Sequence, residues 1–217
     1  MNNFELMLSR HAIREYLDKP IEEEKKKILD EYIMKLNYEY NTHVQVIYDN
    51  DLMFRNAKTD YGSFNGCKNV FALIGKDEEK CGYVGALLAL KVQELELNSC
   101  FVMMTYRKGV VKKNVKIDKG EKLYCSIAFG YGKNNGVAHK SKTMEQVSKI
   151  IGEKSPYFDE VVKACLLAPT CLNQQRFQVV SNNGKIEVKR AGLGIHTTFD
   201  LGILKCHKDL VLKDFGF

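Results

Sequence analysis

The chain has 217 residues, of which 45% are hydrophobic and 28% charged, a composition ordinary for a folded domain in water. Its length allows one large domain or two small ones. No run of about 18 apolar residues occurs, so no membrane span is predicted, and residues 1–6 lack the charged start and apolar stretch of a secretory signal. The net charge of +6 suits an anionic ligand, whereas no groove-binding motif supports a nucleic-acid partner.

Seven cysteines are spread along the chain without a Cys-x-x-Cys pair. Their odd number and wide spacing argue against a disulfide framework and against a zinc site. Reduced and mostly buried thiols fit this pattern better, and together with the lack of a secretory signal they predict a cytoplasmic protein.

Hydrophobic periodicity and turn residues predict helices and strands along the whole chain. The first half is predicted to hold helices over 4–16 and 20–36, strands over 43–48 and 70–74, and a strongly apolar helix over 82–97. A loop or strand over 100–104, a strand over 123–129 and a polar loop over 133–142 follow. The remainder is predicted to form helices over 144–151 and 158–167, a hairpin with strands over 177–180 and 186–189, and a final helix over 199–212.

The two halves show a weak internal repeat. The predicted helix over 28–36 and the strand over 43–48 resemble the helix over 158–167 and the strand over 176–180, and the residues at 85–89 resemble those at 202–206. This indicates an internally duplicated single domain, with pseudo-repeats at about 1–142 and 143–217. Chance similarity between two helix–strand units is the alternative.

A cluster of cationic donors lies near the start of the chain. Arg10 and Arg14 are four residues apart, which places them on one face of the predicted helix, and His11 adds a further donor. Guanidinium groups bind phosphate through paired, charge-assisted hydrogen bonds. The alternative is a solvated basic patch, or a pairing of an arginine with Glu15.

A turn rich in hydroxyl and amide groups lies about 160 residues later, and its candidate ligand-binding residues are Pro169, Thr170, Asn173 and Gln175. These groups supply the directional partners that a flat ring with polar edges needs. A helix cap followed by a turn is the alternative reading of the same residues. A phosphate at one end and such a ring at the other describe flavin mononucleotide, FMN.

Four segments of the chain resemble the nitroreductase family of FMN enzymes. They are Arg10-His11-x-x-Arg14-x-Tyr16, Ala168-Pro169-Thr170-x-x-Asn173-x-Gln175, Phe129-Gly130-Tyr131-Gly132 with the later His139-Lys140-Ser141-Lys142, and the helix over 82–97 with its exit Asn98-Ser99-Cys100-Phe101. The resemblance implies an α+β, nitroreductase-like fold in which helices surround a mixed, mostly antiparallel sheet. It also implies an FMN-dependent oxidoreductase that uses NAD(P)H to reduce nitro compounds, quinones or a similar small acceptor.

The order of the motifs departs from that of the typical family member, in which the Ala-Pro-Ser turn closely follows the arginines. Here the turn lies in the second half, so the chain resembles a single-chain, pseudo-dimeric branch with one flavin, acting as a monomer or homodimer. The resemblance adds Lys140 and Lys142 as a second phosphate-contacting pair, unless they belong to a mobile loop. It also places Ser63, Met103 and Met104 near the ring, unless the methionines only fill the core.

Two other functions remain open from the sequence. One is a different flavin reaction on the same scaffold, such as dehalogenation or ring reduction. The other is a non-catalytic flavin- or nucleotide-binding sensor or storage protein. No residue is predicted to act as a general acid or base, because the flavin would carry the chemistry.

Overall fold

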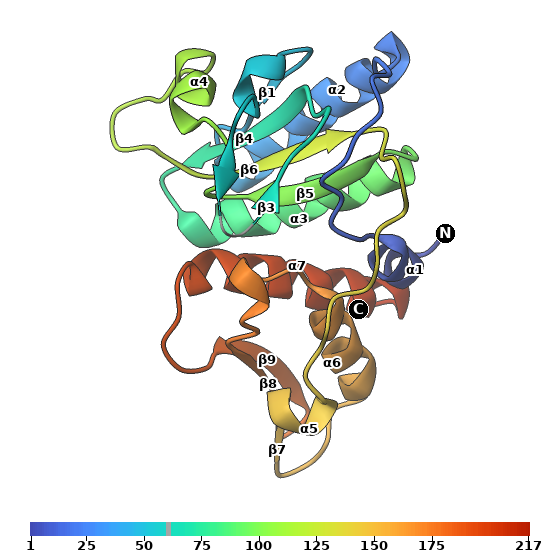
Figure 1. Ribbon diagram of the computed structural model, residues 1–217. Coiled ribbons are helices and arrows are strands. Elements are labelled where there is room, and N and C mark those ends of the chain that lie inside the picture. Colours follow the sequence, from blue (N-terminus) through green and yellow to red (C-terminus); the bar gives the residue numbers. More distant parts are fainter. Residues whose placement is uncertain (60–61) are drawn as a thin grey trace.

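Two main β-sheets, a further two-stranded sheet and a central pair of long helices organise the chain in this computed structural model, which describes residues 1–59 and 62–217 (Figure 1). The helices are α1 (Asn3–Ser9), α2 (Glu23–Tyr40), η1 (Asp51–Met53), α3 (Glu78–Glu94), α4 (Lys108–Lys113), α5 (Met144–Val147), α6 (Phe158–Leu167), η2 (Cys171–Asn173) and α7 (Thr197–Asp214). The strands are β1 (Gln45–Ile47), β2 (Lys58–Thr59), β3 (Gly62–Ser63), β4 (Asn69–Gly75), β5 (Asn98–Val102), β6 (Lys122–Gly130), β7 (Ser148–Ile151), β8 (Phe177–Asn182) and β9 (Lys185–Arg190).

The larger sheet has the strand order β1-β4-β6-β5, and all its neighbouring strands are antiparallel. Every residue of β4 is buried, and successive side chains of a strand point to opposite faces. Phe71 and Leu73 therefore pack into the core that includes α2 and α3, whereas Val70, Ala72 and Ile74 pack into a second core with Met53 of η1 and other residues. Both faces of this sheet are thus covered.

The smaller sheet joins β7, β8 and β9. Its β7–β8 pair is parallel and its β8–β9 pair is antiparallel, so the prediction of an α+β fold with mixed, mostly antiparallel strands is confirmed. The predicted helix over 144–151 is half wrong, because α5 ends at Val147 and Ser148–Ile151 form β7. Pairing of this segment with β8 outweighs the helical pattern of its sequence.

The helices α3 and α7 pack against each other between the two sheets (Figure 1). Two glycines let their backbones approach: a Cβ on Gly82 would lie 2.0 Å from the carbonyl oxygen of Phe199, and one on Gly202 would lie 1.9 Å from that of Glu79. Gly82 faces the residue three positions before Gly202, and Gly202 faces the residue three positions before Gly82. Two helices related by a two-fold axis make contacts that are reciprocal in this way.

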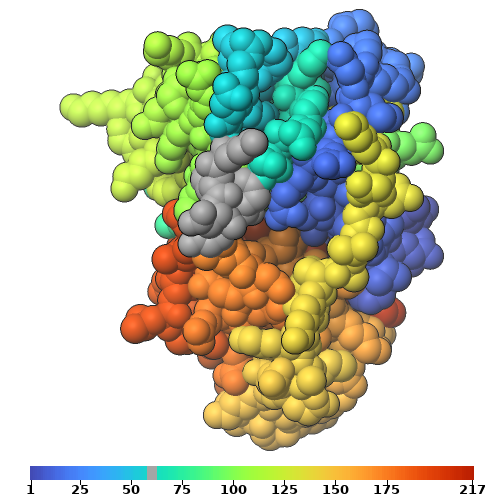
Figure 2. All heavy atoms as spheres, viewed as in Figure 1, coloured from blue at the N-terminus to red at the C-terminus, as the bar shows by residue number. Residues whose placement is uncertain are grey.

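The chain has two parts, one that holds the larger sheet and one that holds the smaller sheet. A long irregular segment, residues 131–143, connects them and runs over the surface from the first part to the second (yellow in Figures 1 and 2). It leaves the larger sheet after β6 and enters α5 beside the smaller one. No described helix is both long enough and apolar enough to cross a membrane.

Candidate functional site

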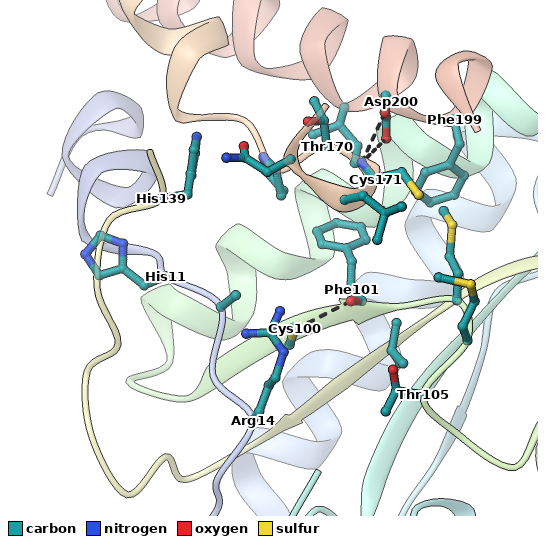
Figure 3. A pocket seen from close by; sticks show the side chains of 18 of the residues that line it. His11, Arg14, Cys100, Phe101, Thr105, His139, Thr170, Cys171, Phe199 and Asp200 are labelled. Carbon is teal, nitrogen blue, oxygen red and sulfur yellow. Dashed lines mark hydrogen bonds between the residues drawn. The ribbon is translucent and has the colours of Figure 1, made fainter. Parts of the chain in front are cut away.

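A cavity of about 290 Å³ lies where the two parts of the chain meet (Figure 3). Ligand sites commonly occupy roughly 300–1,000 Å³, so this cavity is at the small end of that range. The described residues that line it are Arg10, His11, Ala12, Arg14, Phe64, Cys100, Phe101, Val102, Met103, Met104, Thr105, Val137, His139, Pro169, Thr170, Cys171, Leu172, Asn173, Phe199, Asp200 and Ile203. Segments from the start, middle and end of the sequence therefore build one site.

The N-terminal wall is an extended segment, which corrects the prediction of a helix over 4–16. The helix α1 ends at Ser9, and Arg10 already has extended backbone angles. The chain then runs beside β5, where Ala12 forms a parallel bridge with Ser99 and the Ile13 N–H donates to the Ser99 carbonyl at 3.2 Å. The two arginines do not share a helix face, yet both reach the cavity.

Arg10 is the most unusual side chain of this wall, because it is buried and no described residue supplies a counter-ion. Only 5% of the residue is exposed, and its Nε and Nη1 atoms have no hydrogen-bond partner among residues 1–59 and 62–217. Burial lowers the pKa of its guanidinium, and the nearby Cys100 thiol opposes this only as the smaller effect. A buried cation with unpaired donors is costly, so the arrangement favours an anion in the cavity.

Two histidines extend the cationic end of the cavity (Figure 3). Burial lowers the pKa of His11 and of His139, and the charge of Arg10 lowers both further. The Nε2–H of His139 donates to the Leu166 carbonyl at 3.0 Å, which fixes the ring in the cavity wall. His139 was not among the predicted site residues, although it stands beside the predicted lysines in the same extended segment.

The predicted lysines themselves do not line the cavity. The Lys142 ammonium donates to the Gln175 carbonyl at 2.7 Å, and the Lys140 carbonyl accepts hydrogen bonds from the side chains of Asn173 and Gln175. In an extended segment the side chains of alternate residues point to the same side, and those of Val137 and His139 both line the cavity. Whether either lysine contacts a ligand stays a prediction.

The turn after α6 supplies the opposite wall. Leu172, Asn173 and Gln175 all adopt positive φ angles of 50°, 52° and 46°, which residues other than glycine seldom do. Pro169, Thr170 and Asn173 line the cavity. Gln175 does not, because it is 97% buried behind the turn, where its amide accepts from the Lys142 N–H and donates to Asn173 and to the Lys140 carbonyl.

The remaining wall is apolar. Met103 and Met104 line it together with Phe64, Phe101, Phe199 and Ile203, and Met104 is 43% exposed at the mouth. Ser63, in β3, precedes the lining residue Phe64 but is not itself among the lining residues. The cavity is therefore cationic at one end and apolar at the other.

Asp200 is the one carboxylate among the described lining residues, and the sequence analysis missed it. It lies in the first turn of α7, is only 4% exposed, and accepts the Cys171 N–H with both oxygens, at 3.0 and 3.1 Å. Burial raises the pKa of Asp200 to about 6. The one signal for Asp200 in the sequence is its position as an acidic residue between the apolar residues Phe199 and Leu201.

One group of potential metal ligands lies elsewhere in the described part of the chain: the side chains of His43, Asp118 and Glu121 have ligand atoms within 4.8 Å of one another. His43 Nδ1 lies 2.8 Å from a Glu121 carboxylate oxygen, and Lys116 pairs with Asp118 at 3.0 Å. These contacts fasten a surface turn to the strand edge at β1 and account for the cluster without an ion.

Comparison with known proteins gives one family and several similar folds. The family model described as "Putative TM nitroreductase" matches residues 2–211. A structure described as a putative nitroreductase from Thermotoga maritima has a TM-score of 0.69 at 16% identity and covers 99% of this chain and 85% of its own. No curated protein sequence matches.

Two further solved structures share the fold over part of the chain. A putative nitroreductase in complex with FMN from Desulfovibrio desulfuricans has a TM-score of 0.52 at 17% identity, covering 68% of this chain and 96% of its own. A putative NADH dehydrogenase/NAD(P)H nitroreductase from Parabacteroides distasonis has a TM-score of 0.54 at 15% identity, covering 68% and 97%. At sequence identities this low, these matches establish a shared fold alone.

Proposed function

Because the chain belongs to the nitroreductase family described by the matching model, we propose that it is an FMN-dependent oxidoreductase whose cofactor occupies the cavity between its two parts. NAD(P)H is the proposed electron donor, and a nitro compound, a quinone or a similar small molecule is the proposed acceptor. The proposal extends to a cytoplasmic monomer or homodimer that carries one flavin in each chain.

The observation that carries this proposal is the buried guanidinium of Arg10, whose Nε and Nη1 atoms find no partner among the described residues. A phosphate ester supplies the acceptor oxygens that its Nε and Nη1 atoms lack, and charge-assisted hydrogen bonds of this kind are the strong ones. Arg14, His11 and His139 surround the same end of the cavity. No carboxylate of the described residues lies at that end to compete with the phosphate, since Asp200 belongs to the opposite wall.

The apolar wall suits the ring end of the cofactor. The side chains of Phe101, Phe199 and the two methionines exclude water there, while Thr170 and the backbone of the turn offer polar groups to the edge of a ring. A bound flavin supplies hydride and electron-transfer chemistry. The protein's own residues bind the cofactor, orient it and shape the space left for the acceptor at the exposed mouth near Met104.

The visible absorption spectrum of the purified protein, followed by titration with FMN, tests the proposal. We expect a flavin spectrum that NADH or NADPH bleaches and a nitro compound or quinone restores. A yellow protein inert to every reductant would support a sensor or storage function instead. A colourless protein that gains no stability with FMN would refute both.

Replacement of Arg14 tests the phosphate end directly. Arg14→Ala is expected to weaken FMN binding by about 1.5–3 kcal/mol, the contribution of a hydrogen bond to a charged group, and to leave riboflavin binding unchanged because riboflavin lacks the phosphate. Arg55→Ala, which removes an exposed arginine outside the cavity, is the matched control. Equal loss for both ligands would remove Arg14 from the phosphate site.

A further inference from the structure

Asp200 holds the turn that forms one wall of the cavity (Figure 3). Both of its carboxylate oxygens accept the Cys171 N–H, and one of them lies 3.3 Å from the amide nitrogen of Gln174, which donates to it. The Gln174 amide also donates to the Ile195 carbonyl at 2.5 Å, in the loop that leads into α7. Asp200 therefore ties the start of α7 to both ends of η2.

The turn needs such anchors, because its own backbone is strained. Leu172, Asn173 and Gln175 occupy the left-handed region, which non-glycine residues keep only when their surroundings enforce it. On one side, the amides of Asn173 and Gln175 bind the Lys140 carbonyl at 2.8 and 2.9 Å. The Lys142 ammonium also donates to the Gln175 carbonyl there. On the other side, the carboxylate of Asp200 provides the anchor.

We propose that Asp200 is a positioning residue whose ionised carboxylate fixes the turn over 170–175 in the shape that receives the ring of the ligand, so that ligand affinity falls when this carboxylate is protonated. The inference rests on the proposed function for the identity of the ligand. It assigns a role to a buried acid that binding of the phosphate does not use.

Protonation weakens the anchor for a geometric reason. Both oxygens face N–H donors, so a proton on either one replaces a charge-assisted hydrogen bond by a neutral one or opposes a donor. Burial raises the pKa of Asp200 to about 6, so the change falls within a range that the folded protein can be studied in. Above that pH the anchor is ionised, and below it the anchor is neutral.

Four titratable groups influence Asp200 from the elements packed around it: Cys171 in the turn, Cys125 on β6, Glu78 on α3 and His196 at the start of α7. Burial raises the pKa of Cys171 to about 11 and raises that of Cys125 further, so both thiols stay neutral across the pH range of interest. His196 pairs with Glu78 at 3.6 Å. The variant His196→Gln therefore separates the contribution of this pair from that of Asp200.

Riboflavin titrations between pH 5 and 7.5 test the proposal, because riboflavin lacks the phosphate whose own protonation would obscure the result. For the native chain and for His196→Gln, we expect affinity to fall about tenfold on acidification, the full effect of one group titrating near pH 6. For Asp200→Asn, affinity should be lower at pH 7.5 and independent of pH. A pH dependence that persists in Asp200→Asn would overturn the proposal.

Hydrogen exchange of the Cys171 amide in the ligand-free protein supplies a second readout that needs no flavin. For a local opening of the turn that leaves Asp200 buried, the protection factor should fall by up to about tenfold between pH 7 and 5 in the native chain, because the hydrogen bond from Cys171 favours the ionised carboxylate. In Asp200→Asn it should be low and constant. A protection factor that changes neither with pH nor in Asp200→Asn would refute the proposal that Asp200 holds the turn. If neither flavin binds at any pH, the proposed function fails, and the exchange measurement alone still decides whether Asp200 holds the turn.

Discussion

A guanidinium in a protein interior without a counter-ion destabilises the fold that contains it, and Arg10 is such a group in the part of the chain that the structure describes. Arg10→Met keeps much of the side-chain volume and removes the charge. The ligand-free protein should gain about 1–3 kcal/mol in the free energy of unfolding, whereas stabilisation by added FMN should disappear. Urea unfolding with and without FMN measures both effects.

The exposed Arg55 provides the control for this substitution. Its ion pair with Asp51 is solvent-exposed, so Arg55→Met should change stability by less than about 1 kcal/mol and leave the response to FMN intact. If Arg10→Met instead lowered the stability of the ligand-free protein, the unpaired charge would not be the strain that the structure indicates.

Lys142 and Lys140 differ in what their side chains do. The Lys142 ammonium donates to the Gln175 carbonyl and so braces the turn, whereas the Lys140 side chain makes no hydrogen bond or ion pair with any described residue. Lys142→Met should cost about 1.5–3 kcal/mol in the free energy of unfolding, while Lys140→Met should cost little. If Lys140→Met weakens FMN binding but not riboflavin binding, the predicted phosphate contact gains support.

At the scale of the element, the crossing of α3 and α7 depends on two glycines. A methyl group on Gly202 would meet the Glu79 carbonyl oxygen at 1.9 Å, so the helices would have to separate. Gly202→Ala should therefore destabilise the protein by about 3 kcal/mol, although alanine is the better helix former. Thermal or urea unfolding measures the loss.

Gly109 in α4 is the matched control, because a Cβ there would meet nothing within 4 Å. Gly109→Ala should be neutral or should stabilise by about 0.5–1 kcal/mol through helix propensity. A similar loss for both variants would show that the close helix approach is not what makes Gly202 necessary.

The helix α6 was predicted with its observed ends, because its apolar positions repeat at the helical period and Pro169 follows closely after it. The N-terminal segment was not, because the edge of β5 offers hydrogen bonds to residues 12–13 that the local sequence cannot reveal. The strand β7 was missed for the same kind of reason, since its partner β8 lies about 30 residues away. Local sequence patterns thus predict that a helix or strand is present, whereas pairing with segments distant in the sequence decides at which residue it ends.

The candidate site shows the same division. The arginines and the Pro169–Asn173 turn were predicted as a pair from their chemistry, and they do line one cavity. Asp200 belongs to no sequence motif, and His139 was quoted in a family-like segment but not predicted to line the site; the packing of α7 and of the segment over 131–143 brings both to the cavity. The internal duplication stays a proposal. It is supported by the matched order helix–strand–strand–helix of α2-β1-β4-α3 and α6-β8-β9-α7, when the short elements η1, β2, β3 and η2 are set aside.

At the scale of the whole molecule, two buried groups give opposite responses to acid. Burial lowers the pKa of His207 to about 4 from its ordinary 6.5, so stability present above 6.5 is lost as the pH falls toward 4. Burial raises the pKa of Asp200 from 3.8 to about 6, so the folded state gains stability as the pH falls through 6 toward 3.8. Each difference corresponds to about 3 kcal/mol, and the two nearly cancel.

Asp200→Asn removes one side of this balance. On going from pH 7 to pH 4, its free energy of unfolding should fall by about 3 kcal/mol more than that of the native chain. Urea unfolding at the two pH values measures the difference, with Asp209→Asn on the exposed side of α7 as the control. Identical acid responses in the native and Asp200→Asn proteins would contradict the opposing titrations.

The cavity joins a segment near the start of the chain to a helix reached only after residue 196. A nascent chain on the ribosome therefore carries Arg10 through most of synthesis with no opposite wall to complete a binding site. Any ligand of this cavity is acquired after translation of α7. A product truncated before that helix would lack Phe199, Asp200 and Ile203 of the cavity wall, and under the proposed function it would bind no FMN.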